Sequence, residues 1–436
     1  MRGVAEPADR LLHILELGAG SVPIIVQKYG GTSVGSVERI QAVADRVVRA
    51  REAGNDVVVV VSAMGHTTDE LMAMALDIAP VPDARELDML LTAGERIAMS
   101  LLGIAINARG CRAASYTGSQ AGIMTDHQHG QAKIVEIRPR RILEALDAGN
   151  VVVLAGFQGL SVSQFEITTL GRGGSDLTAV AMAAAIGADV CEVYTDVAGV
   201  FTTDPRIAPA AKKLGVVSYD EMLELAAAGA NVLQSRSVEY ARRTGVRLHV
   251  RSSFEDEPGT WIQEVEEPME GVLISGVALD ADEAKVTIDR VPDRPGVAAT
   301  VFKAIADETI SIDMIVQNVS HAGATDLSFT APRADLPRVH SVMERLVKEI
   351  GADRYTVDDG VATLSLVGAG MKTHPGVAAD MFDSLAGEGI NIEMISTSPI
   401  RISCVIREGD GERAVRVVHE RFNLDASGST PEIPTA

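Results

Sequence analysis

Apolar residues in the first half of the chain gather in short β-branched runs that alternate with alanine-rich stretches. Runs of this length cannot span a bilayer, and they are typical of strands buried on both faces of a parallel sheet. The alternation of strand and helix predicts an α/β layered sheet. The predicted strands are residues 24–27, 57–62, 151–157, 190–195 and 247–251, and two predicted helices are residues 177–186 and 219–228.

A sequence repeat organises the second half of the chain. DRPGVAATVFKAIADETISIDMI begins at Asp293, and the similar THPGVAADMFDSLAGEGINIEMI begins at Thr373. Each copy predicts a strand, a Pro-Gly turn, an amphipathic helix and a second strand with alternating Ile and Met, followed by a further strand and helix. We therefore expect two copies of one small α+β module.

The segment FEDEPGTWIQEVEEPMEG is rich in acidic residues, Pro and Gly, which favours a boundary between domains. The length of the chain also favours more than one hydrophobic core. The expected parts are an N-terminal extension without order of its own (1–23), a catalytic domain (24–253), a linker (254–271) and a regulatory region (272–436) with repeat units at about 283–356 and 361–430.

The formal net charge is −21, and no Lys/Arg-rich run offsets it. This charge argues against nucleic acid or an anionic membrane as a partner, and an anionic substrate would need a local cationic pocket. The N-terminal residues do not resemble a secretory signal, so we expect a cytoplasmic protein. The cysteines are odd in number and far apart, which favours buried thiols over a disulfide framework or a zinc site. They are Cys111, Cys191 and Cys404.

Three glycine-bearing turns could hold phosphate or another anion. The first, KYGGTSVG from Lys28, follows a predicted strand and precedes a predicted helix. Its backbone N–H groups, the helix N-terminus and the lysine could bind phosphate. A plain strand-to-helix turn with a solvated lysine explains the pattern equally well. The third, from Thr195 to Arg206, follows another predicted strand, and on its own it is better explained as a surface loop.

The second turn, TTLGRGGSD from Thr168, places Arg172 among three glycines. Ser175 or Asp176 could cap the following helix, but capping does not explain the arginine. This turn favours a ligand, because arginine can bind a carboxylate through two hydrogen bonds.

Two further segments carry acidic and hydroxyl groups. Thr67 to Glu70 and Thr92 to Glu95 both fit a capping box, which predicts that a helix begins at each. His127 and His129 have no nearby third ligand, so a polar loop is favoured over a metal site.

Together these segments resemble the aspartate kinase family from residue 24 to about residue 424. The repeat resembles its paired ACT domains, which sense amino-acid end products. The resemblance implies a three-layer αβα amino-acid kinase domain followed by two α+β ferredoxin-like ACT domains. The motifs that carry it occur in the family's order: KYGGTSVG at Lys28, VSAMGHTTDEL at Val61, LTAGERIAMSLL at Leu91, ITTLGRGGSD at Ile167 and YTDVAGVFTTDPR at Tyr194.

The resemblance also implies ATP, Mg²⁺ and L-aspartate as ligands, with no metal-ligating side chain. Asn231 stands where the family usually has a nucleotide-contacting lysine, so we expect weaker ATP affinity. The implied catalytic residues are Lys28 and Asp176, the implied nucleotide-binding residues are Lys28, Gly30, Gly31, Thr32, Ser62, Thr195, Asp196, Phe201, Arg206 and Asn231, and the implied aspartate-binding residues are Thr68, Glu95, Arg172 and Ser175.

In this interpretation Arg172 pairs with the α-carboxylate of aspartate, Glu95 receives its ammonium group and Thr68 helps to orient it. The side-chain carboxylate is already ionised, so no general base is needed. Lys28 and Mg²⁺ stabilise the transferred phosphoryl group. Asp176 positions Lys28 or the metal-bound nucleotide, and the product is 4-phospho-L-aspartate.

The same resemblance implies feedback regulation by lysine and/or threonine, in a homo-oligomer or an assembly with an internally started regulatory chain. Two alternatives stay open: a related kinase for another acidic amino acid, and a catalytically silent amino-acid sensor. The expected effector pocket consists of Asp293, Gly296, Ala298, Gln317 and Asn318.

Overall fold

The computed structural model describes residues 22–230, 232–265, 273–317, 323–369, 371 and 376–425. The chain divides into two compact units, of which the first comprises Met1–Gly199 and Arg236–Glu264 and the second comprises Val200–Ser235 and Val265–Ala436. Part of the expected catalytic domain thus groups with the C-terminal half. Asn231, Asn318 and residues 1–21 of the expected extension lie outside the described residues.

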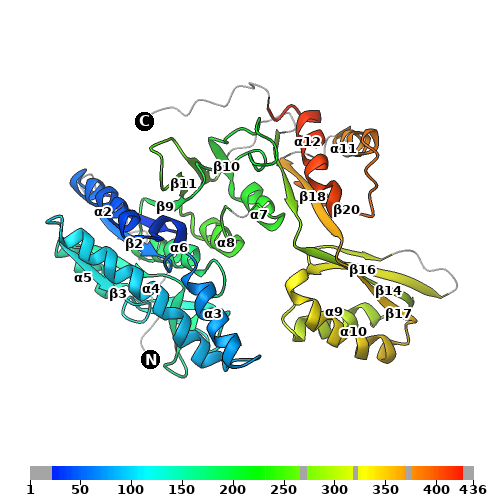
Figure 1. Ribbon diagram of the computed structural model, residues 1–436, viewed down its shortest axis with the longest axis horizontal. Helices are drawn as coiled ribbons and strands as arrows, with labels where there is room; N and C mark the ends of the chain where they lie inside the picture. The colour runs from blue at the N-terminus through cyan, green and yellow to red at the C-terminus, as the bar shows by residue number, and fades with distance from the viewer. Residues whose placement is uncertain are drawn as a thin grey trace, which may run out of the picture. The chain divides into compact units, whose positions relative to one another are not determined.

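A twisted, mostly parallel sheet forms the centre of the first unit, with its strands in the order β12-β11-β9-β1-β2-β6-β3 (Figure 1). All neighbouring pairs are parallel except β11 with β12. The strands are β1 (Ile24–Tyr29), β2 (Asp56–Val61), β3 (Ala113–Tyr116), β6 (Val151–Ala155), β9 (Val190–Thr195), β11 (Leu248–Ser252) and β12 (Thr260–Gln263).

Helices cover the sheet on both faces, which makes three layers. Side chains of β1 and β2 that point to one face share a core with α2 (Val37–Glu52) and α4 (Ala84–Asn107). The other face packs against α6 (Gly174–Ile186), where small alanines allow close approach and nearly every residue is buried. The unit also contains α3 (Thr67–Ile78), α5 (Arg140–Asp147) and α8 (Ser235–Thr244).

A smaller sheet lies in the same unit, with the order β5-β4-β7-β8. Its strand β8 leads into the GRGG turn and α6, so this sheet positions the turn. The strands are β4 (Ile123–Thr125), β5 (Ile134–Ile137), β7 (Gln158–Ser161) and β8 (Ile167–Thr169).

The predicted strands and helices of this unit are confirmed with small shifts at their ends, but the predicted helix start at Thr92 is wrong. Thr92 lies inside α4, which begins at Ala84 and is capped by the side chain of Asp83. Gly94 is needed for packing instead, because a Cβ there would lie 2.8 Å from the Cβ of Ala63. The predicted helix start at Thr67 is confirmed, since α3 begins there, but the predicted capping box is wrong because α3 has no side-chain cap.

The helix α4 is long and apolar enough to cross a membrane, but half of its most apolar 18-residue stretch is buried inside the unit. It also carries the buried carboxyl groups of Asp88 and Glu95. We therefore interpret α4 as the central helix of a folded domain.

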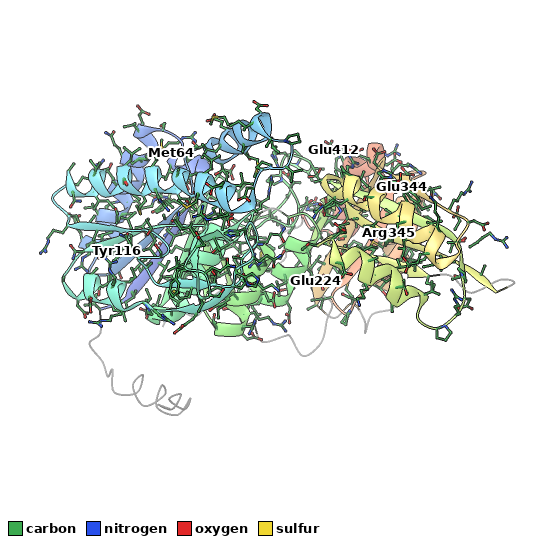
Figure 2. All side chains as sticks on the ribbon, turned by 90° about the horizontal axis from the view of Figure 1, so that it is seen from below. Met64, Tyr116, Glu224, Glu344, Arg345 and Glu412 are labelled. Atoms are coloured by element: carbon green, nitrogen blue, oxygen red, sulfur yellow. The ribbon has the colours of Figure 1, made fainter. Side chains whose placement is uncertain are left out.

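In the second unit the first repeat forms a four-stranded antiparallel sheet with the order β15-β16-β14-β17, packed against two helices. Glu344 and Arg345 lie on the outer side of α10, as expected for an amphipathic helix (Figure 2). The elements of this first module are β14 (Glu283–Pro292), α9 (Val297–Asp307), β15 (Ile315–Gln317), β16 (Ala324–Pro332), α10 (Leu336–Ile350) and β17 (Arg354–Asp358).

The second module takes one strand from elsewhere in the chain. Its sheet has the order β13-β18-β20-β19, and β13 precedes the first module in sequence. The elements are β13 (Leu273–Asp280), β18 (Val361–Ala369), α11 (Gly376–Gly387), β19 (Met394–Thr397), β20 (Arg401–Arg407) and α12 (Gly411–Arg421).

The segment Val200–Ser235 packs on the second module. It contains β10 (Val216–Ser218) and α7 (Tyr219–Ala227). The Thr202 hydroxyl lies 2.9 Å from Nε2 of His419, and Arg401 pairs with Glu224 at 3.2 Å. These polar contacts join the segment to the second module.

Candidate active site

Lys28 lies near the carboxyl end of β1 and points to the face of the sheet that α6 covers. Its Nζ is 2.6 Å from Oδ1 of Asp176, and both side chains are almost buried. Asp176 and Ser175 were predicted as possible caps, but α6 begins after Gly173 and has no side-chain cap. The carboxylate of Asp176 therefore pairs with a lysine, and the ion pair ties the first turn of α6 to β1.

The turn after Lys28 leaves its backbone accessible and requires glycine. A Cβ on Gly31 would lie 2.9 Å from the carbonyl oxygens of both Ala63 and Gly65, which excludes any side chain. Residues 31–34, including Thr32, form a short 3₁₀ helix. An anion above this turn would meet backbone N–H groups together with the lysine ammonium.

Three adjacent parallel strands end beside this turn. Ser62 follows β2 and donates its backbone N–H to the carbonyl of Tyr29 at 3.1 Å. Thr195 ends β9, and its hydroxyl donates to Asp196 at 3.1 Å. Ligands of α/β sheets bind at the carboxyl ends of the strands, which is where Lys28, Ser62 and Thr195 lie.

Glu95 is a buried carboxyl group on α4 with an unused oxygen. Its Oε1 accepts the backbone N–H of Ala63 at 3.4 Å, whereas Oε2 has no hydrogen-bond partner among the described residues. Burial raises the pKa of Glu95 to about 7. A buried, unpaired oxygen suits an incoming donor such as an ammonium group. Thr68 lies in the first turn of α3, a helix that packs against α4.

Arg172 projects from the GRGG turn and is exposed. Gly171 and Gly173 on either side have positive φ angles of 82° and 71°, which glycine adopts without strain. Arg172 makes no hydrogen bond or ion pair to any residue in the described ranges, so its guanidinium is available to a ligand. Ser175 is buried, and a Cβ on Gly156 would lie 2.6 Å from its Oγ.

The remaining predicted nucleotide contacts belong to the second unit or lie outside the described residues. Phe201 and Arg206 belong to the second unit. There Arg206 forms an ion pair with Asp204 at 2.6 Å. No group of three or more metal-ligating side chains occurs within the described residues.

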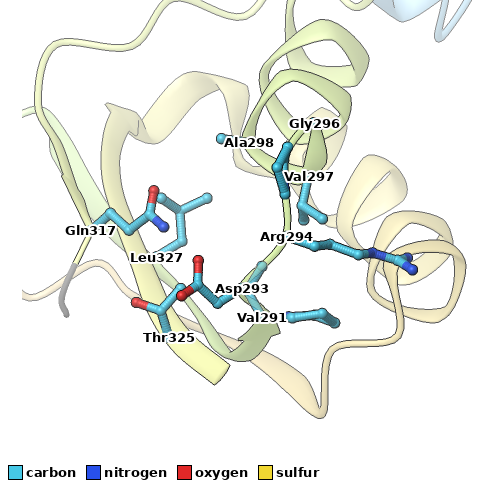
Figure 3. A pocket seen from close by; sticks show the side chains of 11 residues that line it. Val291, Asp293, Arg294, Gly296, Val297, Ala298, Gln317, Thr325 and Leu327 are labelled. Atoms are coloured by element: carbon cyan, nitrogen blue, oxygen red, sulfur yellow. The ribbon is translucent and has the colours of Figure 1, made fainter. Parts of the chain in front are cut away.

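The first module contains a cavity of about 330 Å³ beside the turn that precedes α9. Asp293, Gln317 and Leu327 converge on it from the turn, β15 and β16, while the side chain of Arg294 extends away from Gln317 (Figure 3). Of the residues predicted for the effector pocket, Asp293, Gly296, Ala298 and Gln317 all line this cavity.

Sequence reasoning did not single out Asp88. This carboxyl is only 1% exposed and lies on the same helix as Glu95. An acidic residue within the apolar stripe of a long helix is the signal that could have identified it.

A kinase domain of the amino-acid kinase type followed by two ACT modules is the class that this fold and site define. Residues 23–252 match the amino acid kinase family, and residues 285–351 and 364–422 each match an ACT domain.

The chain is 54% identical to an aspartokinase of Corynebacterium efficiens over 92% of this chain and 96% of that protein. It also resembles the crystal structure of E. coli aspartokinase III in complex with aspartate and ADP, with 26% identity, a TM-score of 0.79, and coverage of 92% of this chain and 99% of that one. The same E. coli enzyme in complex with lysine and aspartate gives 26% identity and a TM-score of 0.70 over 92% and 99% of the two chains.

The chain belongs to the aspartate kinase family. It is an enzyme that transfers a phosphoryl group from ATP to a carboxylate of aspartate.

Proposed function

We propose that this enzyme phosphorylates the side-chain carboxylate of L-aspartate, giving 4-phospho-L-aspartate, and that lysine and/or threonine inhibit it through the ACT modules. The ion pair of Lys28 with Asp176 beside the Gly30-Gly31 turn carries the catalytic part of the proposal, because it holds a cation in position at an anion-binding turn.

Aspartate binds through its α-amino-acid groups in this proposal. The available guanidinium of Arg172 pairs with the α-carboxylate, and the unpartnered Oε2 of Glu95 accepts from the ammonium. Thr68 and Ser175 help to orient the substrate. The side-chain carboxylate is then left to attack the γ-phosphorus of ATP. It is ionised at neutral pH, so the enzyme contributes alignment and charge neutralisation rather than proton abstraction.

ATP binds at the carboxyl ends of the strands. Lys28, Gly30, Gly31 and Thr32 hold its phosphates, and Ser62, Thr195 and Asp196 lie beside it. Phe201, Arg206 and Asn231 stay predicted nucleotide contacts, because the family resemblance implies them. Mg²⁺, when bound with the nucleotide, neutralises phosphate charge. Asp176 keeps the Lys28 ammonium aimed at the transferred group, where its charge matters most as the phosphoryl group moves.

The cavity in the first ACT module supports effector binding. Its volume lies within the roughly 300–1,000 Å³ typical of small-molecule pockets. The carboxylate of Asp293 suits an amino-acid ammonium group, and the exposed N-terminus of α9 after Gly296 suits its carboxylate. The lysine complex of the E. coli relative favours lysine as one effector. We also propose a cytoplasmic homo-oligomer or an assembly with a separate regulatory chain.

Trapping of the acyl phosphate with hydroxylamine tests the catalytic proposal. Aspartyl hydroxamate should form only when enzyme, ATP, Mg²⁺ and aspartate are all present. A panel of other acidic amino acids provides the alternative: hydroxamate from another acid, with none from aspartate, would favour the related-kinase hypothesis. If the enzyme phosphorylates neither aspartate nor another acidic amino acid, the hypothesis of a catalytically silent sensor is favoured.

A further inference from the structure

We propose that Asp88 and His129 are positioning residues that fix the Arg172 turn relative to Glu95 and so set the geometry of the aspartate site. This inference rests on the proposed roles of Arg172 and Glu95 and extends them to residues that do not touch the substrate.

The carboxyl group of Asp88 accepts hydrogen bonds from one loop and from the end of strand β8. Its Oδ2 lies 2.7 Å from Nδ1 of His129, its Oδ1 accepts the hydroxyl of Thr169 at 2.6 Å, and the backbone N–H of Gly130 lies 3.1 and 3.2 Å from the two oxygens. A fully buried carboxyl group is costly unless its oxygens accept hydrogen bonds. The contacts therefore bind the loop with His129 and the end of β8 firmly to α4.

The residues that donate to Asp88 are connected to the Arg172 turn through the backbone. Thr169 ends β8 three residues before it, and its carbonyl accepts the backbone N–H of Ala132 from the same loop as His129. Arg236 joins the two segments a second time, because its guanidinium donates to the carbonyls of Leu170 at 2.7 Å and Ala132 at 3.1 Å. The backbone up to the turn is thus held, while the Arg172 side chain itself remains available.

The helix that carries Asp88 also carries Glu95. Asp88 and Glu95 lie on one helix seven residues apart, which places them two turns apart on the same face, about 10 Å along the axis. One rigid helix therefore carries the group proposed to bind the substrate ammonium and the group that holds the turn proposed to bind its α-carboxylate. Movement of this turn by even 1 Å would misplace the α-carboxylate and with it the nucleophile.

Steady-state kinetics with the full-length enzyme test this role. In Asp88→Asn the shape is kept but the side chain loses one acceptor, so the KM for aspartate should rise about tenfold or more, with the KM for ATP within twofold of the wild type. His129→Leu should have the same effect. His129→Asn can place an amide N–H near the position of Nδ1, and it should restore most of the aspartate affinity. His127→Leu, an exposed position on the same loop, is the matched control and should leave both constants unchanged.

A purely structural role predicts another pattern: a lower melting temperature with both KM values unchanged or shifted together, and no rescue by His129→Asn. That pattern would overturn the inference. If Asp88→Asn does not fold, the His129 pair and Thr169→Val, which removes only the hydroxyl donor, decide the question in its place. A wild-type enzyme that makes no aspartyl hydroxamate would refute the proposed function itself. An active wild type with unchanged aspartate KM in these variants would refute only the positioning role.

Discussion

The candidate active site and the cavity of the first ACT module both suit an amino acid, but they are built differently. In the kinase unit three of the charged groups are almost buried, because Lys28 pairs with Asp176 and Glu95 is 3% exposed, and only Arg172 is exposed. In the ACT module Asp293 and Gly296 lie on an exposed turn. Catalysis requires charges held in place before the reaction, whereas an effector needs only to bind two conformations unequally.

The largest expected effect comes from the buried cation. Lys28→Met keeps the aliphatic volume but removes the charge, and it should lower kcat about 10²- to 10³-fold because that charge acts mainly on the transferring phosphoryl group. Initial rates at saturating aspartate and ATP measure it. Lys133→Ala, an exposed lysine of the same unit, is the control. A Lys28→Met enzyme that folds and retains kcat within threefold would remove Lys28 from the catalytic machinery.

Arg172 should affect substrate binding more than turnover. Loss of a charged hydrogen-bonding partner costs about 1.5–3 kcal/mol, so Arg172→Ala should raise the KM for aspartate roughly 10- to 100-fold. The KM of Arg172→Lys for aspartate should lie between those of the wild type and Arg172→Ala, because lysine cannot bind the carboxylate through two parallel hydrogen bonds. An unchanged aspartate KM in Arg172→Ala would contradict the assignment, with Arg138→Ala as the exposed control.

The pKa of Glu95 predicts a pH dependence. Burial raises it to about 7 in the empty site, and only the ionised carboxylate can form an ion pair with the ammonium. The KM for aspartate should therefore be constant above pH 7 and rise up to tenfold per pH unit below it. Glu95→Gln should have a higher KM at every pH and a flat profile over pH 6–8. A sloping profile in this variant would assign the titration to another group.

The smallest effect is expected in the ACT cavity. Asp293→Ala should raise the inhibition constant for lysine or threonine by about tenfold or less, since this exposed charge is partly screened by solvent. Without effector, kcat and both KM values should stay at wild-type levels. Arg294→Ala is the comparison variant on the same turn: Arg294 also lines the cavity, but its side chain extends away from Gln317 (Figure 3). Equal loss of inhibition in both variants would mean that the turn as a whole, rather than the Asp293 carboxylate, is required.

Local sequence patterns predicted the strands of the kinase sheet because each is a short apolar run bounded by polar turns. The patterns misplaced the start of α4, since Thr92 and Glu95 imitate a capping box inside a long helix. The contact of Lys28 with Asp176 could be expected from the resemblance alone, because nothing local links residues so far apart. Asp88 was missed because its partners come from loops that only the folded chain brings together.

Two further differences between the prediction and the structure also arise from contacts between residues distant in sequence. The segment expected as a linker over 254–271 contains β12, which pairs with β11 across a polar, Gly-containing connection. The repeat pattern predicted two similar modules, but it could not indicate that β13 completes the sheet of the second one. Pairing between strands distant in sequence leaves no local signal.

The position of β13 also has a consequence for the order of folding. This strand is synthesised before the whole first module, yet its partner β18 follows that module, with Leu279 opposite Leu364. During synthesis the first module can fold as soon as β17 has emerged from the ribosome. In contrast, β13 stays without its hydrogen-bonding partner until β18 has been synthesised. Closure of the long loop makes the second module the slower one to form. Once closed, the sheet joins the two ends of the first module through the pair of β13 with β18.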